Sequence, residues 1–254
     1  MLISARVLDD YKIDATDGNI GRVHTLLFDD ERWVVRYVVV DTGKWLRGRR
    51  VLVTPGQVGT PEHKMRVLPV ELTQEQIKNS PDIDTERPVS RQQELELHKY
   101  YQVAPYWDGI YGPFAGSFAP AEPVLGAEAR RAEEAEREVE KDQENPHLRS
   151  TREVIGYKIH AADGFIGHVD DFIVDSSEWV IRYVVADTKK WLAGKKVLLP
   201  PSWIKEIEWL EGEAVFDVLK ETIKHSPEFN ASEAVNREYE VRLYDYYGRP
   251  TYWV

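Results

Sequence analysis

Short apolar runs bounded by acidic residues and glycines recur along the chain. The densest run, over residues 33–42, reads Trp-Val-Val-Arg-Tyr-Val-Val-Val-Asp-Thr. Its β-branched and aromatic residues predict a central strand. A period of two places Trp33, Val35 and Tyr37 on one face, and most residues of the other face are apolar too. A strand buried on both sides favours a closed or strongly curled sheet.

The chain contains one internal repeat, found at a shift of 146 positions. Trp33 falls on Trp179, and Ser80-Pro81 falls on Ser226-Pro227. From residue 2 to residue 107 no gap is needed, and 42 of the 106 aligned positions are identical. Equal turn lengths and equal apolar patterns predict that both copies adopt the same fold.

Turn signals divide each copy into short strands. Asp17-Gly18 and its equivalent Asp163-Gly164 are typical hairpin turns between apolar segments. The strands expected after them cover residues 23–28, 33–42, 51–53 and 64–70, with counterparts at 169–174, 179–188, 197–199 and 213–217. We therefore expect five or six antiparallel strands per copy.

Two short helices are expected after the strands of each copy. Thr73 and Gln76 have the spacing of a capping box, and the helix should end at Ser80-Pro81, because proline lacks the next amide donor. Second helices are expected over 90–101 and 236–247. The fold class is thus mainly β with helical appendages: two small antiparallel β-barrels related by duplication, each followed by two short helices.

These patterns predict three segments along the chain. A first domain should cover residues 1–111, a linker 112–146, and a second domain 147–254. The linker is rich in Gly and Pro and then in Ala, Glu and Arg. Its second part has strong helix formers but almost no apolar stripe, so it reads as either a solvated helix or a flexible connector.

Composition narrows the classes of partner and compartment. The formal charge of -11 argues against nucleic acid as the default partner. No cysteine is present, which excludes a disulfide framework, a thiolate nucleophile and cysteine-ligated zinc. No signal-peptide pattern and no apolar run of membrane-spanning length occur. We expect a cytoplasmic protein without a transmembrane segment.

The set of motifs resembles the PRC-barrel family over both copies. The set runs from the Asp-Gly turn through Ile-Gly-x-Val and Trp-x-x-Arg-Tyr-Val-Val to Asp-Thr, Trp-Leu-x-Gly and a Val-Leu strand. The resemblance implies a small antiparallel barrel that acts mainly as an interaction module. Such barrels form the cytoplasmic domain of the photosynthetic reaction centre H subunit and the C-terminal domain of a ribosome maturation factor.

Each copy has one basic loop beside a Trp-Leu pair. One interpretation is a surface for anions such as lipid headgroups, RNA or an acidic partner. The other, which we favour, is a solvated turn whose Trp and Leu close the barrel end. The candidate anion- or partner-binding residues are Lys44, Arg47, Arg49, Arg50, Lys189, Lys190, Lys195 and Lys196.

Aromatic residues recur at the end of both copies. Such residues are enriched at interfaces, although they can equally pack on their own domain, which we favour because both sets keep the same positions. The interface candidates are Tyr100, Tyr101, Tyr106, Trp107, Tyr246, Tyr247, Tyr252 and Trp253.

No motif indicates catalysis. The sequence lacks a Gly-x-Ser-x-Gly elbow and a phosphate-binding glycine loop. His160 and His168, with nearby aspartates, could in principle form one metal site, and the first copy has Asp14 and Arg22 at those positions. We expect no enzymatic activity, no cofactor and no metal.

Three functional hypotheses follow. The favoured one is a non-enzymatic interaction or assembly module, forming a homo-oligomer or an intramolecular pseudo-dimer, with an unknown protein partner. By resemblance it could support photosynthetic electron transport. The second is an anion-binding module that uses the two basic loops for RNA, a ribosome or membrane headgroups. The third is a hydrolase or metal-dependent enzyme at His160 and His168.

Overall fold

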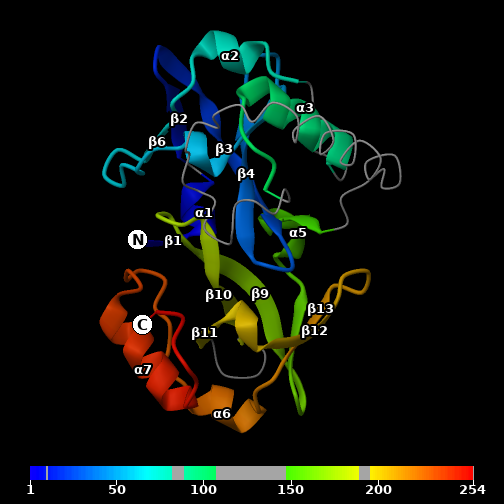
Figure 1. Ribbon diagram of the computed structural model, residues 1–254. Helices are drawn as coiled ribbons and strands as arrows, with labels where there is room; N and C mark the ends of the chain where they lie inside the picture. Colours follow the sequence, from blue (N-terminus) through cyan, green and yellow to red (C-terminus); the bar gives the residue numbers. More distant parts are fainter. Residues whose placement is uncertain (10, 82–88, 107–146, 189–194, 254) are drawn as a thin grey trace. The chain divides into compact units, whose positions relative to one another are not determined.

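The chain forms a β-rich fold with short helices (Figure 1). The computed structural model describes residues 1–9, 11–81, 89–106, 147–188 and 195–253, and the expected linker at 112–146 lies outside them. The chain divides into two compact units. Unit 1 comprises Met1–Asp9, Arg32–Val35 and Ser150–Val254, and unit 2 comprises Asp10–Glu31 and Arg36–Arg149.

Unit 2 contains most of the first repeat. Its strands are β2 (Lys12–Ala15), β3 (Gly18–Asp29), β4 (Val34–Asp41, whose first two residues belong to unit 1), β5 (Arg50–Val53) and β6 (Val67–Pro69), with the 3-10 turn η1 (Pro55–Gln57) after β5. The helices α2 (Gln74–Lys78) and α3 (Arg91–Tyr101) follow. The capping box at Thr73 and Gln76 is confirmed, and Ser90 caps α3 in the same way.

Unit 1 contains most of the second repeat. It begins with β1 (Leu2–Ser4) and α1 (Ala5–Leu8), and continues with α5 (Thr151–Val154), β8 (Lys158–Ala161), β9 (Gly164–Asp175), β10 (Val180–Asp187) and β11 (Lys196–Leu199). The last elements are η2 (Pro201–Trp203), β12 (Ile204–Glu208), β13 (Glu213–Phe216), α6 (Lys220–His225) and α7 (Arg237–Tyr247).

Element boundaries recur at the shift found in the sequence. Strands β3 and β9 have 12 residues each and start at residues 18 and 164, which differ by 146. Strands β4 and β10 have eight residues each, and β5 and β11 have four each. The predicted β-rich class with two helices after the strands is confirmed in both repeats.

The predicted closure of each repeat into an antiparallel barrel is wrong. The strand path is open, with order β12-β13-β8-β9-β10-β11 in unit 1, and no β11–β12 pairing closes it among the described residues. Strand β13 pairs with β8 in parallel, and β6 pairs with β2 in parallel. In a parallel pair the two strands run in the same direction and are joined by a long connection. No local turn signal in the sequence reveals such a pairing.

The leading strands do not stay with their own repeats. Strand β1 pairs with β9 of unit 1, whereas β7 (Leu148–Ser150) pairs with β3. In unit 1, Ser4 Oγ donates to Asp171, and the Arg6 amide donates to Asp171 Oδ1 at 3.1 Å. In unit 2, Leu148 lies in the core with Leu27 and Tyr37. The expected ranges 1–111 and 147–254 therefore do not coincide with the compact units.

The central strand is buried as its pattern predicted. In β4, Tyr37, Val38 and Val39 have no exposed surface. Its predicted start is shifted by one residue, because Trp33 and Trp179 lie in the preceding turns with φ of 58° and 56°. The Val35 amide donates to the Trp179 carbonyl at 2.7 Å, and the Ile181 amide donates to the Trp33 carbonyl at 2.8 Å.

The Ile-Gly-x-Val motif has a steric cause. A Cβ added at Gly21 would lie 2.1 Å from the Asp41 carbonyl oxygen, and one added at Gly167 would lie 2.1 Å from that of Asp187. Only glycine permits this approach between the long strand and the end of the following strand.

Within the described residues, no helix is long and apolar enough to span a bilayer.

Candidate functional site

One cation of each basic loop holds a helix end. Arg49 donates to the carbonyls of Lys78 at 2.9 Å and Pro81 at 2.8 Å, at the end of α2. Lys195, its counterpart, donates to the carbonyl of Lys224 at 2.9 Å and also to that of Ser226. Burial lowers the pKa of Lys195. These two cations satisfy carbonyls that a helix C-terminus leaves without intrahelical partners.

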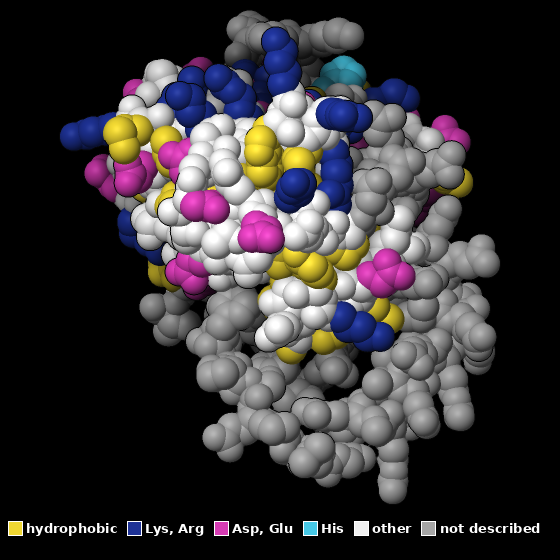
Figure 2. Space-filling view, turned by 90° about the horizontal axis from the view of Figure 1, so that it is seen from above, with side chains coloured by type: hydrophobic (Ala, Val, Ile, Leu, Met, Phe, Trp, Pro, Cys, Tyr) yellow, Lys and Arg dark blue, Asp and Glu magenta, His cyan; other side chains and the backbone are white. Residues whose placement is uncertain are grey.

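The other cations of the loops differ in their surroundings. Lys196 forms an ion pair with Asp170 at 2.6 Å, and Arg50 is half-buried. Lys44 and Arg47 are exposed, beside an exposed Trp45. Lys189 and Lys190 lie outside the described residues. On the face of unit 2 seen from above in Figure 2, Lys and Arg side chains lie among hydrophobic and acidic ones. The described part of the candidate anion surface is therefore small.

The aromatic tails pack on their own helices and strands. Tyr100 donates to the Gln76 carbonyl at 2.7 Å, and its counterpart Tyr246 donates to the Thr222 carbonyl at the same distance. Burial raises the pKa of Tyr101 and of Tyr247 to about 12. Trp107 lies outside the described residues. These contacts fit packing within the chain, but Tyr100 and Tyr246 are 36% and 39% exposed, so their interface role stays a prediction.

A buried carboxylate joins helix, strand and tail in each repeat. In unit 1, Tyr183 of β10 and Tyr252 of the tail both donate to Glu240 Oε1 at 2.7 Å, and Glu240 is 2% exposed. Arg237 lies 3.2 Å from Glu240 Oε2 and balances its charge. Burial raises the pKa values of Tyr183 and Tyr252, so both stay protonated donors.

The first repeat builds the same contact with one change. Tyr37 and Tyr106 donate to Glu94 Oε1 at 3.0 and 2.9 Å, and Glu94 has no exposed surface. His98 Nε2 lies 2.8 Å from the Tyr37 hydroxyl, at the position that Tyr244 occupies in the second repeat.

Cations also cover the tail rings. The Arg36 guanidinium lies 4.0 Å from the centre of the Tyr106 ring, and Arg182 lies 4.1 Å from that of Tyr252. Arg237 lies 4.0 Å from the Trp253 ring centre. Such contacts add an electrostatic attraction to the packing of each tail.

The described residues around His160 and His168 form no group of ligands for a metal ion. Phe165 lies between the two imidazoles, with ring centres 5.6 Å from His160 and 5.3 Å from His168. Asp170 pairs with Lys196, and Asp171 accepts from the β1–α1 segment. Among the described residues no group of three or more potential ligands is close enough to hold a metal ion.

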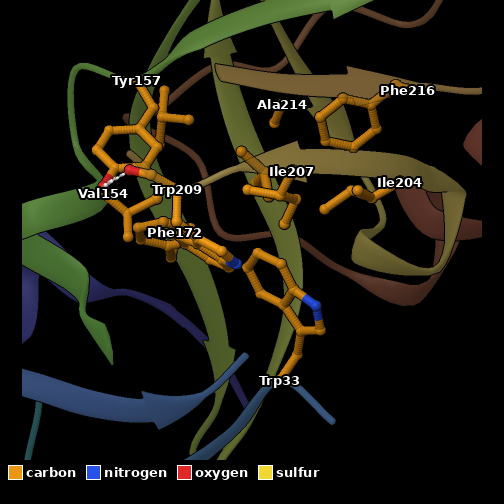
Figure 3. Close-up of a pocket in the computed structure, with 11 residues that line it drawn as sticks. Trp33, Val154, Tyr157, Phe172, Ile204, Ile207, Trp209, Ala214 and Phe216 are labelled. Carbon is orange, nitrogen blue, oxygen red and sulfur yellow. Dashed lines mark hydrogen bonds between the residues drawn. The ribbon is translucent and has the colours of Figure 1, made fainter. Parts of the chain in front are cut away.

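One apolar pocket lies within unit 1, and the sequence reasoning missed it (Figure 3). It is a small recess with a free volume of about 10 Å³, about enough for one water molecule. Its floor is buried and includes Val169, Phe172 and Phe216. Its half-buried rim is formed by Trp33, Tyr157, Ile204, Ile207 and Trp209.

The rim residues come from separate elements. Trp33 enters from the turn before β4, and its ring centre lies 6.4 Å from that of Phe172. Tyr157 precedes β8 and donates to the Trp209 carbonyl at 3.3 Å. Apart from this phenol, no lining residue has a titratable side chain. The lining is therefore suited to apolar groups, with the Tyr157 phenol as its one titratable side chain.

The signal for this pocket is a difference between the repeats. Ala214 stands in the floor where the first repeat has the fully buried Leu68. Ile207 and Trp209 stand on the rim where the first repeat has Pro61 and His63. The second repeat is therefore less filled inside and more apolar at the rim.

Residues 147–221 match the PRC-barrel domain family. The match covers 75 of the 254 residues and lies within the second repeat. It includes β8 to β13 and therefore most of the pocket lining. No curated protein matches the chain.

Proposed function

We propose that the chain is a non-enzymatic interaction and assembly module made of two PRC-barrel-type units in tandem. The PRC-barrel match supports the coarse class, an interaction or assembly domain. The recurrence of element boundaries at 146 residues supports extending it to the first repeat.

The observation that carries the proposal is the chemistry of the pocket. Its lining is apolar apart from one phenol, and it opens through a rim of half-buried aromatic and aliphatic side chains. The half-buried rim side chains, rather than the small recess itself, hold apolar area that leaves water when a partner covers the rim. The buried ionisable groups Glu94 and Glu240 meanwhile hold the tails in place.

Affinity purification from the native cell tests this proposal. Wild type should retain a defined set of proteins, and Ile207→Ser should lose at least one of them, because the substitution makes the rim polar. Val241→Ser is the matched control, since Val241 is an exposed apolar residue of α7 outside the pocket. Equal retention by all three chains would contradict a role for the pocket.

The narrower proposal is support of photosynthetic electron transport, and it rests on the family resemblance alone. Removing the chain from a phototrophic source cell should slow light-driven electron transfer in its membranes. An unchanged rate would refute this narrower role and leave the interaction role standing. The contacts of Arg49, Lys195 and Lys196 give no specific support to the anion-binding alternative.

A further inference from the structure

The two tail contacts differ at one buried position. His98 of α3 stands where α7 has Tyr244, and the two residues are 4% and 3% exposed. The backbone contact at this position is the same in both repeats. The Val103 amide donates to the His98 carbonyl at 3.0 Å, and the Arg249 amide donates to the Tyr244 carbonyl at 3.2 Å. The two tails therefore begin alike, and the first adds an imidazole to its attachment.

Three side-chain contacts connect this imidazole to the tail and to the buried carboxyl group. His98 Nδ1 lies 3.3 Å from the Val103 carbonyl oxygen, and His98 Nε2 lies 2.8 Å from the Tyr37 hydroxyl. The same hydroxyl lies 3.0 Å from Glu94 Oε1. Each contact needs a hydrogen of its own, and the carbonyl can only accept. An ionised Glu94 and a neutral His98 leave two hydrogens for three contacts, one on the hydroxyl and one on the ring.

A third hydrogen completes the set, and it fits at either end. On the imidazole, it makes both ring nitrogens donors, to Tyr37 and to the Val103 carbonyl, while Tyr37 donates to the carboxylate. On Glu94, it is donated to the Tyr37 oxygen, and Tyr37 then donates to Nε2 of a neutral ring. The set is therefore complete only when Glu94 and His98 share one titratable proton. Tyr244 carries its own hydrogen near neutral pH, because burial raises its pKa to about 12.

Other polar and charged groups surround the set. Tyr106 donates to the same carboxyl oxygen at 2.9 Å, and its ring centre lies 6.2 Å from that of the imidazole. Arg36 covers the Tyr106 ring at 4.0 Å and pairs with Asp29 at 2.9 Å. Glu96 and Lys99 of α3 are exposed to water. The Arg36 charge is thus balanced beside the tail ring, and water screens the two exposed charges of the helix.

We propose that the shared proton makes the tail of the first repeat a pH-sensitive latch, closed at pH 6 and loosened at pH 8. Histidine takes up and loses its proton between pH 5 and 8. Because the folded contact binds this proton, its stabilisation is present at the acid end of that range and is lost as the pH rises. The tail of the second repeat has no such proton and should not respond. The latch goes beyond the proposed interaction role and is independent of it.

Amide hydrogen exchange measured by NMR on the full chain tests this between pH 6 and 8. Each rate is divided by that of an unstructured peptide at the same pH, which removes the chemical effect of hydroxide. Protection of the Val103 amide should fall by about tenfold or more over this range, since one hydrogen bond of a buried set is lost. The Arg249 amide makes the equivalent contact in the other repeat and should keep its protection.

Three variants separate the latch from other causes. His98→Tyr installs the side chain of the second repeat and should abolish the fall at Val103. His98→Gln should do the same and serves if the tyrosine variant fails to fold. The matched control is His63→Gln, which should keep the fall, because His63 also contacts a tyrosine hydroxyl, that of Tyr11 at 2.8 Å, outside the tail. An equal response of Val103 and Arg249, or a fall that persists in the folded His98 variants, would overturn the proposal.

Discussion

The buried carboxylate of unit 1 gives the sharpest stability prediction, through Tyr183→Phe. Tyr183 has no exposed surface and donates to Glu240 Oε1 at 2.7 Å. The substitution removes one of the two tyrosine hydrogen bonds to that oxygen and leaves Tyr252 and Arg237 in place. A hydrogen bond to a charged group contributes ~1.5–3 kcal/mol.

The expected thermal shift follows from chain length. A loss of 1 kcal/mol lowers Tm by about 2–4 °C in proteins of this size, so Tyr183→Phe should lower it by about 3–12 °C. Near-ultraviolet circular dichroism is a suitable assay, because the aromatic tail and α7 dominate the surroundings of this contact.

The control is Tyr246→Phe in the same helix. Tyr246 donates over the same 2.7 Å but is 39% exposed, so water can replace the lost bond to the Thr222 carbonyl. Its Tm should change by only about 1–2 °C, as is usual for an exposed polar group. If the two variants shift Tm equally, the carboxylate contact does not have the strength assigned to it.

Three further predictions concern other parts of the fold. Burial raises the pKa of Tyr244 to about 12, above its unfolded value of 10.0. The free energy that this phenol contributes to folding is therefore complete below pH 10 and is lost as the pH rises toward 12. Urea midpoints across this window should fall less in Tyr244→Phe than in wild type. Gly167→Ala should destabilise by at least ~2 kcal/mol in urea unfolding, because its Cβ would clash with the Asp187 carbonyl, whereas Gly156→Ala meets no atom and should cost less. Arg49→Ala should raise amide hydrogen exchange at the end of α2, and unchanged exchange would contradict its capping role.

Much of the fold could be predicted because local signals agree with it. The Asp-Gly turns, the capping box at Thr73 and the burial of both faces of β4 all appear in the sequence as patterns of neighbouring residues. The exchange of the leading strands could not be predicted. Leu2 and Leu148 are identical at the repeat shift, so either segment fits either long strand, and only tertiary pairing decides.

The candidate site was predicted less well, for a related reason. The basic loops offered anion binding as one of two interpretations, and neither foresaw a helix-end contact, because the carbonyls that Arg49 contacts lie 29 and 32 residues away in the sequence. The pocket depends on the small side chain of Ala214 opposite Trp33, which also lie far apart in sequence. A comparison of the two repeats, Leu68 against Ala214, is the one sequence signal that could have indicated it.

The size of the complex that contains this chain in extracts of its own cells tests the interaction role most directly. We predict that wild type elutes well above the 29.4 kDa of a single chain and that Ile207→Ser moves toward that mass. Wild type eluting as a single free chain, unchanged by the substitution, would contradict it.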